Sequence, residues 1–80
     1  MEVDVMQIPQ RGHRVWTAIL EGKTSFPLSF FAAKILVVRS RSIAAKDPSR
    51  IRALSDELYD LYANNINTPS AKADIANMLR

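Results

Sequence analysis

Residues 26–64 read FPLSFFAAKILVVRSRSIAAKDPSRIRALSDELYDLYAN. Asp47 and Pro48 divide this stretch in two, because aspartate is a preferred helix N-cap and proline fits the first helical turn. The second part repeats apolar residues at intervals of three and four, as an amphipathic helix does. These residues are Ile51, Leu54, Leu58 and Leu61. We therefore predict helices near residues 27–45 and 48–64 that pack antiparallel across the joint.

The first of these two helices is apolar on most of its circumference. Apolar residues recur at intervals of three and four, and others lie between them. The recurring residues are Leu28, Phe31, Ile35 and Val38. A helix that is apolar on most sides has to be covered on most sides. We expect Phe31 to lie in the core of the chain, and a second chain to cover the opposite side at Phe30 and Val37.

The flanking segments complete the predicted fold. Thr68 and Pro69 repeat the cap-and-proline signal and predict a third helix near residues 69–79, folded back over the other two. Valines alternate with acidic residues at the N-terminus, and this pattern predicts a short extended segment over residues 3–8. Residues 13–20 fit either a short helix or the second strand of a hairpin, and both bury Trp16. The prediction is a mainly α, single-domain bundle of three main helices, with an α+β fold containing an N-terminal β-hairpin as the alternative.

Composition limits the ways in which so short a chain can be stabilised. Eighty residues make one domain, and domains of this size bury too little surface to be more than marginally stable. Cysteine is absent and His13 is the only histidine, which excludes disulfides, thiolate metal sites and a histidine-based metal site within one chain. Contact with a partner chain is the remaining stabilisation.

The most apolar stretch is too short to span a membrane. Residues 26–38 contain Ser29 and Lys34, whereas a membrane-spanning helix needs about 20 mainly apolar residues. The stretch also begins too far along the chain for the apolar region of a secretory signal. We expect a cytoplasmic protein that does not associate with membranes.

The residues that support catalysis are few. Gly12 and Gly22 are the only glycines, so there is no Gly-rich phosphate loop. Asp56 and Asp60 stand one helical turn apart, a spacing typical of a solvated acidic face. The sequence therefore predicts a protein that is not an enzyme and has no cofactor or metal, and a small enzyme is the least favoured reading.

Charge is polarised along the chain. Residues 23–52 carry seven lysines and arginines and one aspartate, a net charge of +6, whereas residues 53–80 carry a net charge of −2. The basic residues near the joint have three readings: a solvated face, a surface for an acidic protein, or a site for nucleic-acid phosphate. Nucleic acid is less favoured than a protein partner, because the acidic residues of 56–60 are close in sequence and no aromatic residue is interleaved with the cations.

These patterns favour a non-catalytic interaction or regulatory adaptor module that acts as a homodimer, with an acidic protein as a further candidate partner. Its expected interface contains Phe30, Ile35, Val37, Tyr59 and Tyr62. The alternative is a small nucleic-acid-binding regulator that uses the basic joint. Its candidate residues are Arg39, Arg41, Lys46, Arg50 and Arg52.

Overall fold

A computed structural model describes residues 8–79, which are helical or irregular and contain no strand. The elements in chain order are α1 (Arg14–Leu20), α2 (Phe31–Lys46), the 3-10 turn η2 (Pro48–Arg50), α3 (Ile51–Asn64) and α4 (Pro69–Met78). The predicted mainly α bundle with three main helices is confirmed. The hairpin alternative is wrong, because α1 takes the helical option that the sequence left open. The extended segment expected at 3–8 lies, apart from Ile8, outside the described residues.

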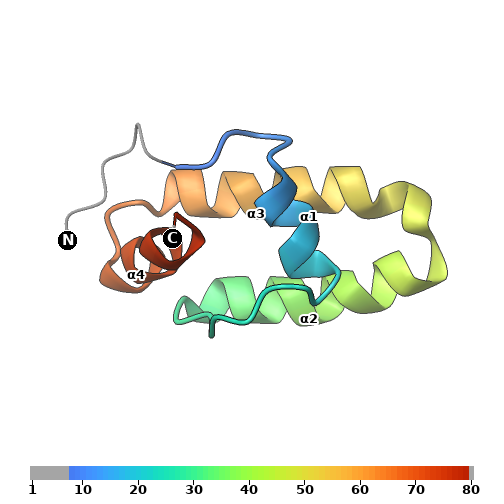
Figure 1. Ribbon diagram of the computed structural model, residues 1–80, viewed down its shortest axis with the longest axis horizontal. Coiled ribbons are helices and arrows are strands. Elements are labelled where there is room, and N and C mark those ends of the chain that lie inside the picture. The colour runs from blue at the N-terminus through green and yellow to red at the C-terminus, as the bar shows by residue number, and fades with distance from the viewer. Residues whose placement is uncertain (1–7, 80) are drawn as a thin grey trace.

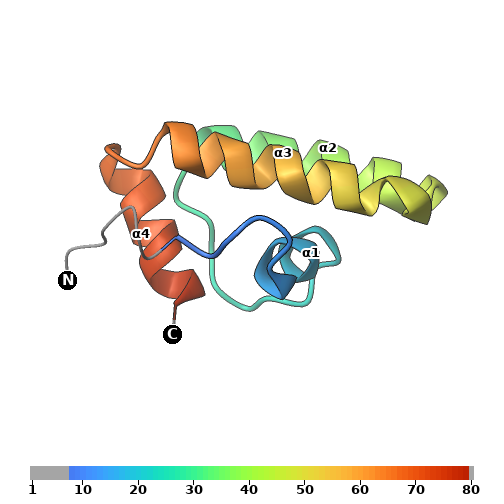
Figure 2. The ribbon, with the colours of Figure 1, turned by 90° about the horizontal axis from the view of Figure 1, so that it is seen from above.

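The helices form two layers. α2 and α3 run antiparallel side by side (Figure 1), as the joint at Asp47 and Pro48 predicts. The second layer consists of α1, which contacts both long helices, and α4, which crosses one end of the pair. Both lie on the same face of the α2–α3 layer (Figure 2), and no other described helix covers the opposite face. The molecule measures 37 × 21 × 20 Å.

The joint between α2 and α3 follows the local signals in the sequence. The Asp47 carboxylate accepts hydrogen bonds from the backbone N–H of Ser49 at 3.3 Å and from its hydroxyl at 2.6 Å. Pro48 opens η2, which runs directly into α3. At the other end of α3, Asn65 follows the helix with a φ of −125°, and its side-chain amide donates to the carbonyl oxygen of Leu61 at 2.8 Å.

Helix α1 is short and is held by contacts at both ends. The His13 Nδ1 accepts a hydrogen bond from the backbone N–H of Val15 and so acts as the N-cap. Beyond the C-terminus, Gly22 has a φ of +74°, a conformation that glycine adopts without strain. The Arg41 side chain of α2 donates to the carbonyl oxygen of Ile19 from Nε at 3.1 Å and from an Nη nitrogen at 2.9 Å. A guanidinium at this end also suits the helix dipole.

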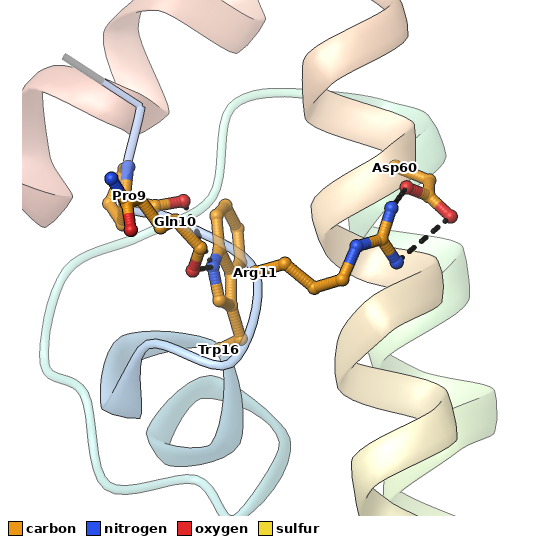
Figure 3. A network of polar contacts seen from close by, with 5 residues as sticks. All are labelled: Pro9, Gln10, Arg11, Trp16 and Asp60. Carbon is orange, nitrogen blue, oxygen red and sulfur yellow. Dashed lines mark hydrogen bonds and ion pairs between the residues drawn. The ribbon is translucent and has the colours of Figure 1, made fainter. Parts of the chain in front are cut away.

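The core lies between the two layers, around Trp16. The indole is fully buried, and its Nε1–H donates to the carbonyl oxygens of Pro9 and Gln10 (Figure 3) at 3.2 and 3.0 Å. The Tyr62 ring packs 5.7 Å from the Trp16 ring, measured between centroids. Other buried side chains from every helix surround this pair: Ile19, Leu20, Ala33, Val37, Leu54, Leu58, Ala71 and Ile75.

Candidate functional site

Helix α2 presents an apolar face away from the core. Phe31, Ile35 and Val38 are 71%, 52% and 70% exposed, although each has a large apolar side chain. Their spacing of four and three residues places them on one side of the helix. They make up three of the four large apolar residues exposed among residues 8–79, the fourth being Leu79 of the C-terminal end. Isolated apolar residues are common on surfaces, whereas several large ones side by side on one helix are less common. We call these three residues the outer face of α2.

The prediction of which side of α2 faces the core is therefore wrong. Phe31 was expected to be buried, and Val37 was expected to face a second chain. Val37 is instead 2% exposed and packs in the core, and Phe30 is half-buried against it. Of the three residues near α2 predicted for the interface, Ile35 is exposed and Phe30 is partly exposed. Val37 is buried and cannot touch another chain without unfolding the bundle.

Small residues on α2 explain this orientation. Ala33, Val37 and Ser40 are the buried residues of the helix and share one side of it. Small side chains let α2 approach α3 and α1 closely, and Trp16, Leu58 and Tyr62 supply the volume of the core. Phe31 would be too large for this side of the helix. Phe31, Ile35 and Val38 are thus directed outward, whereas Leu36 and Ile43 pack partly against the core.

The two tyrosines predicted for the interface also belong to the interior of the bundle. Tyr62 is fully buried, and its ring lies 5.7 Å from the Phe30 ring, centroid to centroid. Tyr59 is half-buried and meets Trp16 edge to face at 5.8 Å. The outer side of the Tyr59 ring is covered by the Arg11 guanidinium, whose Cζ lies 4.9 Å from the ring centroid. Tyr62 is therefore shielded from any other chain, whereas Tyr59 keeps part of its surface exposed.

Arg11 holds the N-terminal loop on α3. Its guanidinium forms an ion pair with the Asp60 carboxylate (Figure 3), while it also covers Tyr59. Both partners of this ion pair are half-exposed, so its contribution to stability is small. Hydrogen bonding to Asp60 raises the pKa of Arg11 further above its usual value. Asp60, considered above as one of a pair of acidic residues, is thus engaged in a structural contact.

Asp74 is a buried carboxylate that sequence patterns did not reveal. It is fully buried and accepts three hydrogen bonds. The donors are the backbone N–H groups of Ser29 at 2.5 Å and Phe30 at 3.1 Å, and the Tyr62 hydroxyl at 2.5 Å. Since Phe30 is the N-cap of α2, and no side chain of its own caps this helix, α4 supplies the carboxylate that suits its N-terminal amides. This contact explains why α2 begins at Phe31 rather than near residue 27.

The Tyr62 hydroxyl is tied to this carboxylate. Burial of the ring, and after it the hydrogen bond to Asp74, raise the pKa of Tyr62 well above its usual value of about 10. The hydroxyl therefore stays protonated and donates. Asp74 and Tyr62 link α3, α4 and the segment before α2 into one structural unit.

Cations border the outer face of α2 on both sides. Lys34 and Arg41, seven residues apart, lie on one side, and Arg39 and Lys46, also seven apart, lie on the other. Ile35 and Val38 line a surface groove together with Lys34 and Arg39. A neighbouring groove adds the loop residues Phe26 and Leu28 beside Val38. Helix α2 contains no acidic residue.

The five predicted anion-binding residues do not act as one group. Arg41 is committed to the Ile19 carbonyl oxygen at the end of α1. Arg39 borders the outer face, and Lys46, Arg50 and Arg52 are exposed at the joint. The ion pairs among residues 8–79 are Arg11 with Asp60 and Lys23 with Glu21, so none of these five cations pairs with a carboxylate in the described part of the chain.

The chain's one histidine and one of its paired aspartates have structural contacts. His13 caps α1, and Asp60 binds Arg11. Among residues 8–79, no three histidine, cysteine or acidic side chains lie close enough together to hold a metal ion. Within the same part of the chain, no helix has the length and apolar character needed to cross a membrane.

Comparisons with family models, with curated proteins and with solved structures found no match. The outer face of α2 and the cations around it remain as the candidate contact surface. The three residues of the outer face could be identified in the sequence, because Phe31, Ile35 and Val38 follow a spacing of four and three. Which side of α2 faces the core became evident only from the packing of Ala33 and Val37.

Proposed function

We propose that this chain is a non-catalytic protein–protein interaction module that binds its partner through the outer face of α2. The observation that carries the proposal is the exposure of Phe31, Ile35 and Val38 in one row on a helix. Contact with a protein would remove this apolar surface from water, at a gain of roughly 25 cal/mol for each Å² buried. The homodimer expected from the sequence is one form of this function, with a second copy as the partner.

Two further observations support an interaction role. The described core consists of about a dozen buried apolar side chains, a small number for an independent domain. The outer face also lies on a long, regular helix held at both ends, by Asp74 before its first turn and by the Asp47 joint after its last. A rigid helix is a suitable contact element because little conformational entropy is lost when it binds.

The test compares the whole wild-type chain with a double variant, Ile35→Ser plus Val38→Ser. Both substitutions lie on exposed positions, so the variant should keep its helical content and unfolding midpoint. We expect it to lose self-association measured by light scattering, or binding to synthetic amphipathic helices measured by fluorescence anisotropy. The matched control, Ala53→Ser plus Glu57→Ser, changes exposed residues of α3. If the wild-type chain is monomeric and binds no amphipathic helix of any charge, the proposal is overturned.

A nucleic-acid-binding regulator is the second candidate. Lys46, Arg50 and Arg52 favour it, because they are exposed together at the joint and the nearby Asp47 carboxylate is engaged by Ser49. Phosphate contacts would make binding fall steeply as salt rises. Gel-shift titrations with duplex and single-stranded probes at low salt test this candidate, with Arg50→Ala plus Arg52→Ala as the variant. Binding that is absent, or unchanged in the variant, would exclude the joint as a nucleic-acid site.

A further inference from the structure

The cations around the outer face of α2 identify the kind of partner. We infer that the outer face binds an amphipathic helix of another protein whose apolar row is flanked by glutamate or aspartate. This inference rests on the proposed function and adds the chemistry of the partner to it. Three features of α2 carry it: the spacing of the apolar row, the charge of its borders, and the lack of a matching surface on a second copy.

The spacing suits one helix lying along another. From Phe31 the row continues through Ile35 and Val38 to Ser42 and Ala45, at intervals of four, three, four and three residues. This is the repeat by which two helices bury a common row of side chains between them. The 16 residues of α2 extend for about 24 Å, so a partner helix of similar length covers the whole row. The smaller Ser42 and Ala45 allow the partner to approach closely near the joint.

The borders of the row determine which partner fits. In a pair of helices, the residues that flank the apolar row face the flanking residues of the partner and set partner choice. On α2 these positions hold Lys34 and Arg41 on one side and Arg39 and Lys46 on the other. Lys34 and Arg39 line the same groove as Ile35 and Val38. A partner with carboxylates at its flanking positions would meet the cations of Lys34, Arg39 and Lys46, whereas Arg41 stays bound to the Ile19 carbonyl oxygen.

A second copy of the chain does not provide such a surface. Pairing α2 with α2 would bring lysines and arginines against lysines and arginines in either orientation, an arrangement that suppresses association. The acidic residues Asp56 and Glu57 are on α3, but the apolar row of α3 is turned into the core. The described part of the chain therefore offers no apolar row with acidic borders to its own α2.

The experiment uses three synthetic helices of three heptads with the same leucine row. Their flanking positions carry glutamate, glutamine or lysine, and each is titrated against the whole chain by fluorescence anisotropy at low and at high salt. We expect the glutamate helix to bind about tenfold more tightly than the glutamine helix, and the lysine helix to bind least. Raising the salt should reduce these differences.

Two charge-reversal variants assign the effect to the outer face. Lys34→Glu plus Arg39→Glu should reverse the order and favour the lysine helix. Arg50→Glu plus Arg52→Glu makes the same change in net charge at the joint, and should keep the wild-type order.

The outcomes separate the two proposals. Equal binding of all three helices, lost in Ile35→Ser plus Val38→Ser, would support the outer face as a contact site and overturn the inference about its partner. A wild-type chain that self-associates through the outer face and ignores the glutamate helix would do the same. No binding of any helix by a monomeric chain would overturn both.

Discussion

At the level of single residues, the structure depends most on Asp74. A buried carboxylate without a cation is tolerated because three donors, from Ser29, Phe30 and Tyr62, point at its two oxygens. Asp74→Asn keeps the shape but places an NH₂ group where an acceptor is needed. We expect the free energy of unfolding to fall by about 2 kcal/mol or more, measured by urea denaturation.

Glu57→Gln is the matched control for this variant, because it removes a carboxylate from an exposed position of α3. It should change the free energy of unfolding by less than about 0.5 kcal/mol. Equal effects of the two substitutions would mean that the Asp74 contacts do not hold the N-terminus of α2.

The raised pKa of Tyr62 predicts how the free energy of unfolding responds to alkaline pH. Burial and the hydrogen bond to Asp74 raise its pKa, so above pH about 10 the unfolded chain releases this proton while the folded chain retains it. The stability that Tyr62 contributes is complete below pH about 10 and is lost as the pH rises further, by up to about 1.4 kcal/mol per pH unit. Tyr62→Phe should remove this part of the slope between pH 10 and 12 in urea unfolding series. A slope that is unchanged in Tyr62→Phe, with Tyr59→Phe as the control, would contradict the assignment.

At the level of elements, the decisive feature is the orientation of α2 about its own axis. Val37 and Val38 are adjacent valines, one buried and one 70% exposed. Val37→Ala removes core atoms and should cost about 1–3 kcal/mol of unfolding free energy. Val38→Ala removes exposed atoms and should cost less than about 0.5 kcal/mol. Urea denaturation of both variants at low protein concentration measures the difference, and equal losses would show that α2 faces the other way in solution.

The sequence predicted the elements well and their packing less well. The joint at Asp47 and Pro48, the helix opened by Pro69 and the apolar stripe of α3 depend on neighbouring residues, and all are where local signals placed them. The start of α2 depends on Asp74, which is 43 positions beyond Phe31 in the chain, and no local signal reports that contact. The side of α2 that faces the core was predicted wrongly for a different reason. A helix apolar on both sides carries no periodicity that distinguishes them, so the sizes of the opposing side chains decide.

The candidate site shows the same division. Ile35, predicted for the interface, is exposed, and the cations near the joint were recognised but were interpreted as a separate feature. Once α2 is oriented, Lys34 and Arg39 become the borders of an apolar row. Phe30, Val37 and Tyr62 were predicted for the interface, but Val37 and Tyr62 belong to the core that contains Trp16 and Ala33, and Phe30 packs against it.

At the level of the whole molecule, the charge around the outer face predicts how the chain responds to salt. A dimer joined by ion pairs weakens as salt rises, whereas a chain whose contact row is bordered by like charges associates more readily when these charges are screened. We expect light scattering to give the mass of one 9.0 kDa chain at low salt, with association, where it occurs, increasing toward 1 M salt.

For the same reason, we expect a charge-reversed copy of the chain to pair with the wild-type chain. When two α2 helices pair in parallel along the row of the outer face, Lys34 of each helix faces Arg39 of the other. In a mixture, a pair formed by the wild type and Lys34→Glu plus Arg39→Glu therefore has two opposite-charged contacts in place of two like-charged ones. The mixture should reach twice the mass of one chain at low salt, whereas each protein alone stays lighter, and added salt should reverse this. A mixture whose mass equals the average of its separate components at every salt concentration would show that the borders of the outer face do not select its partner.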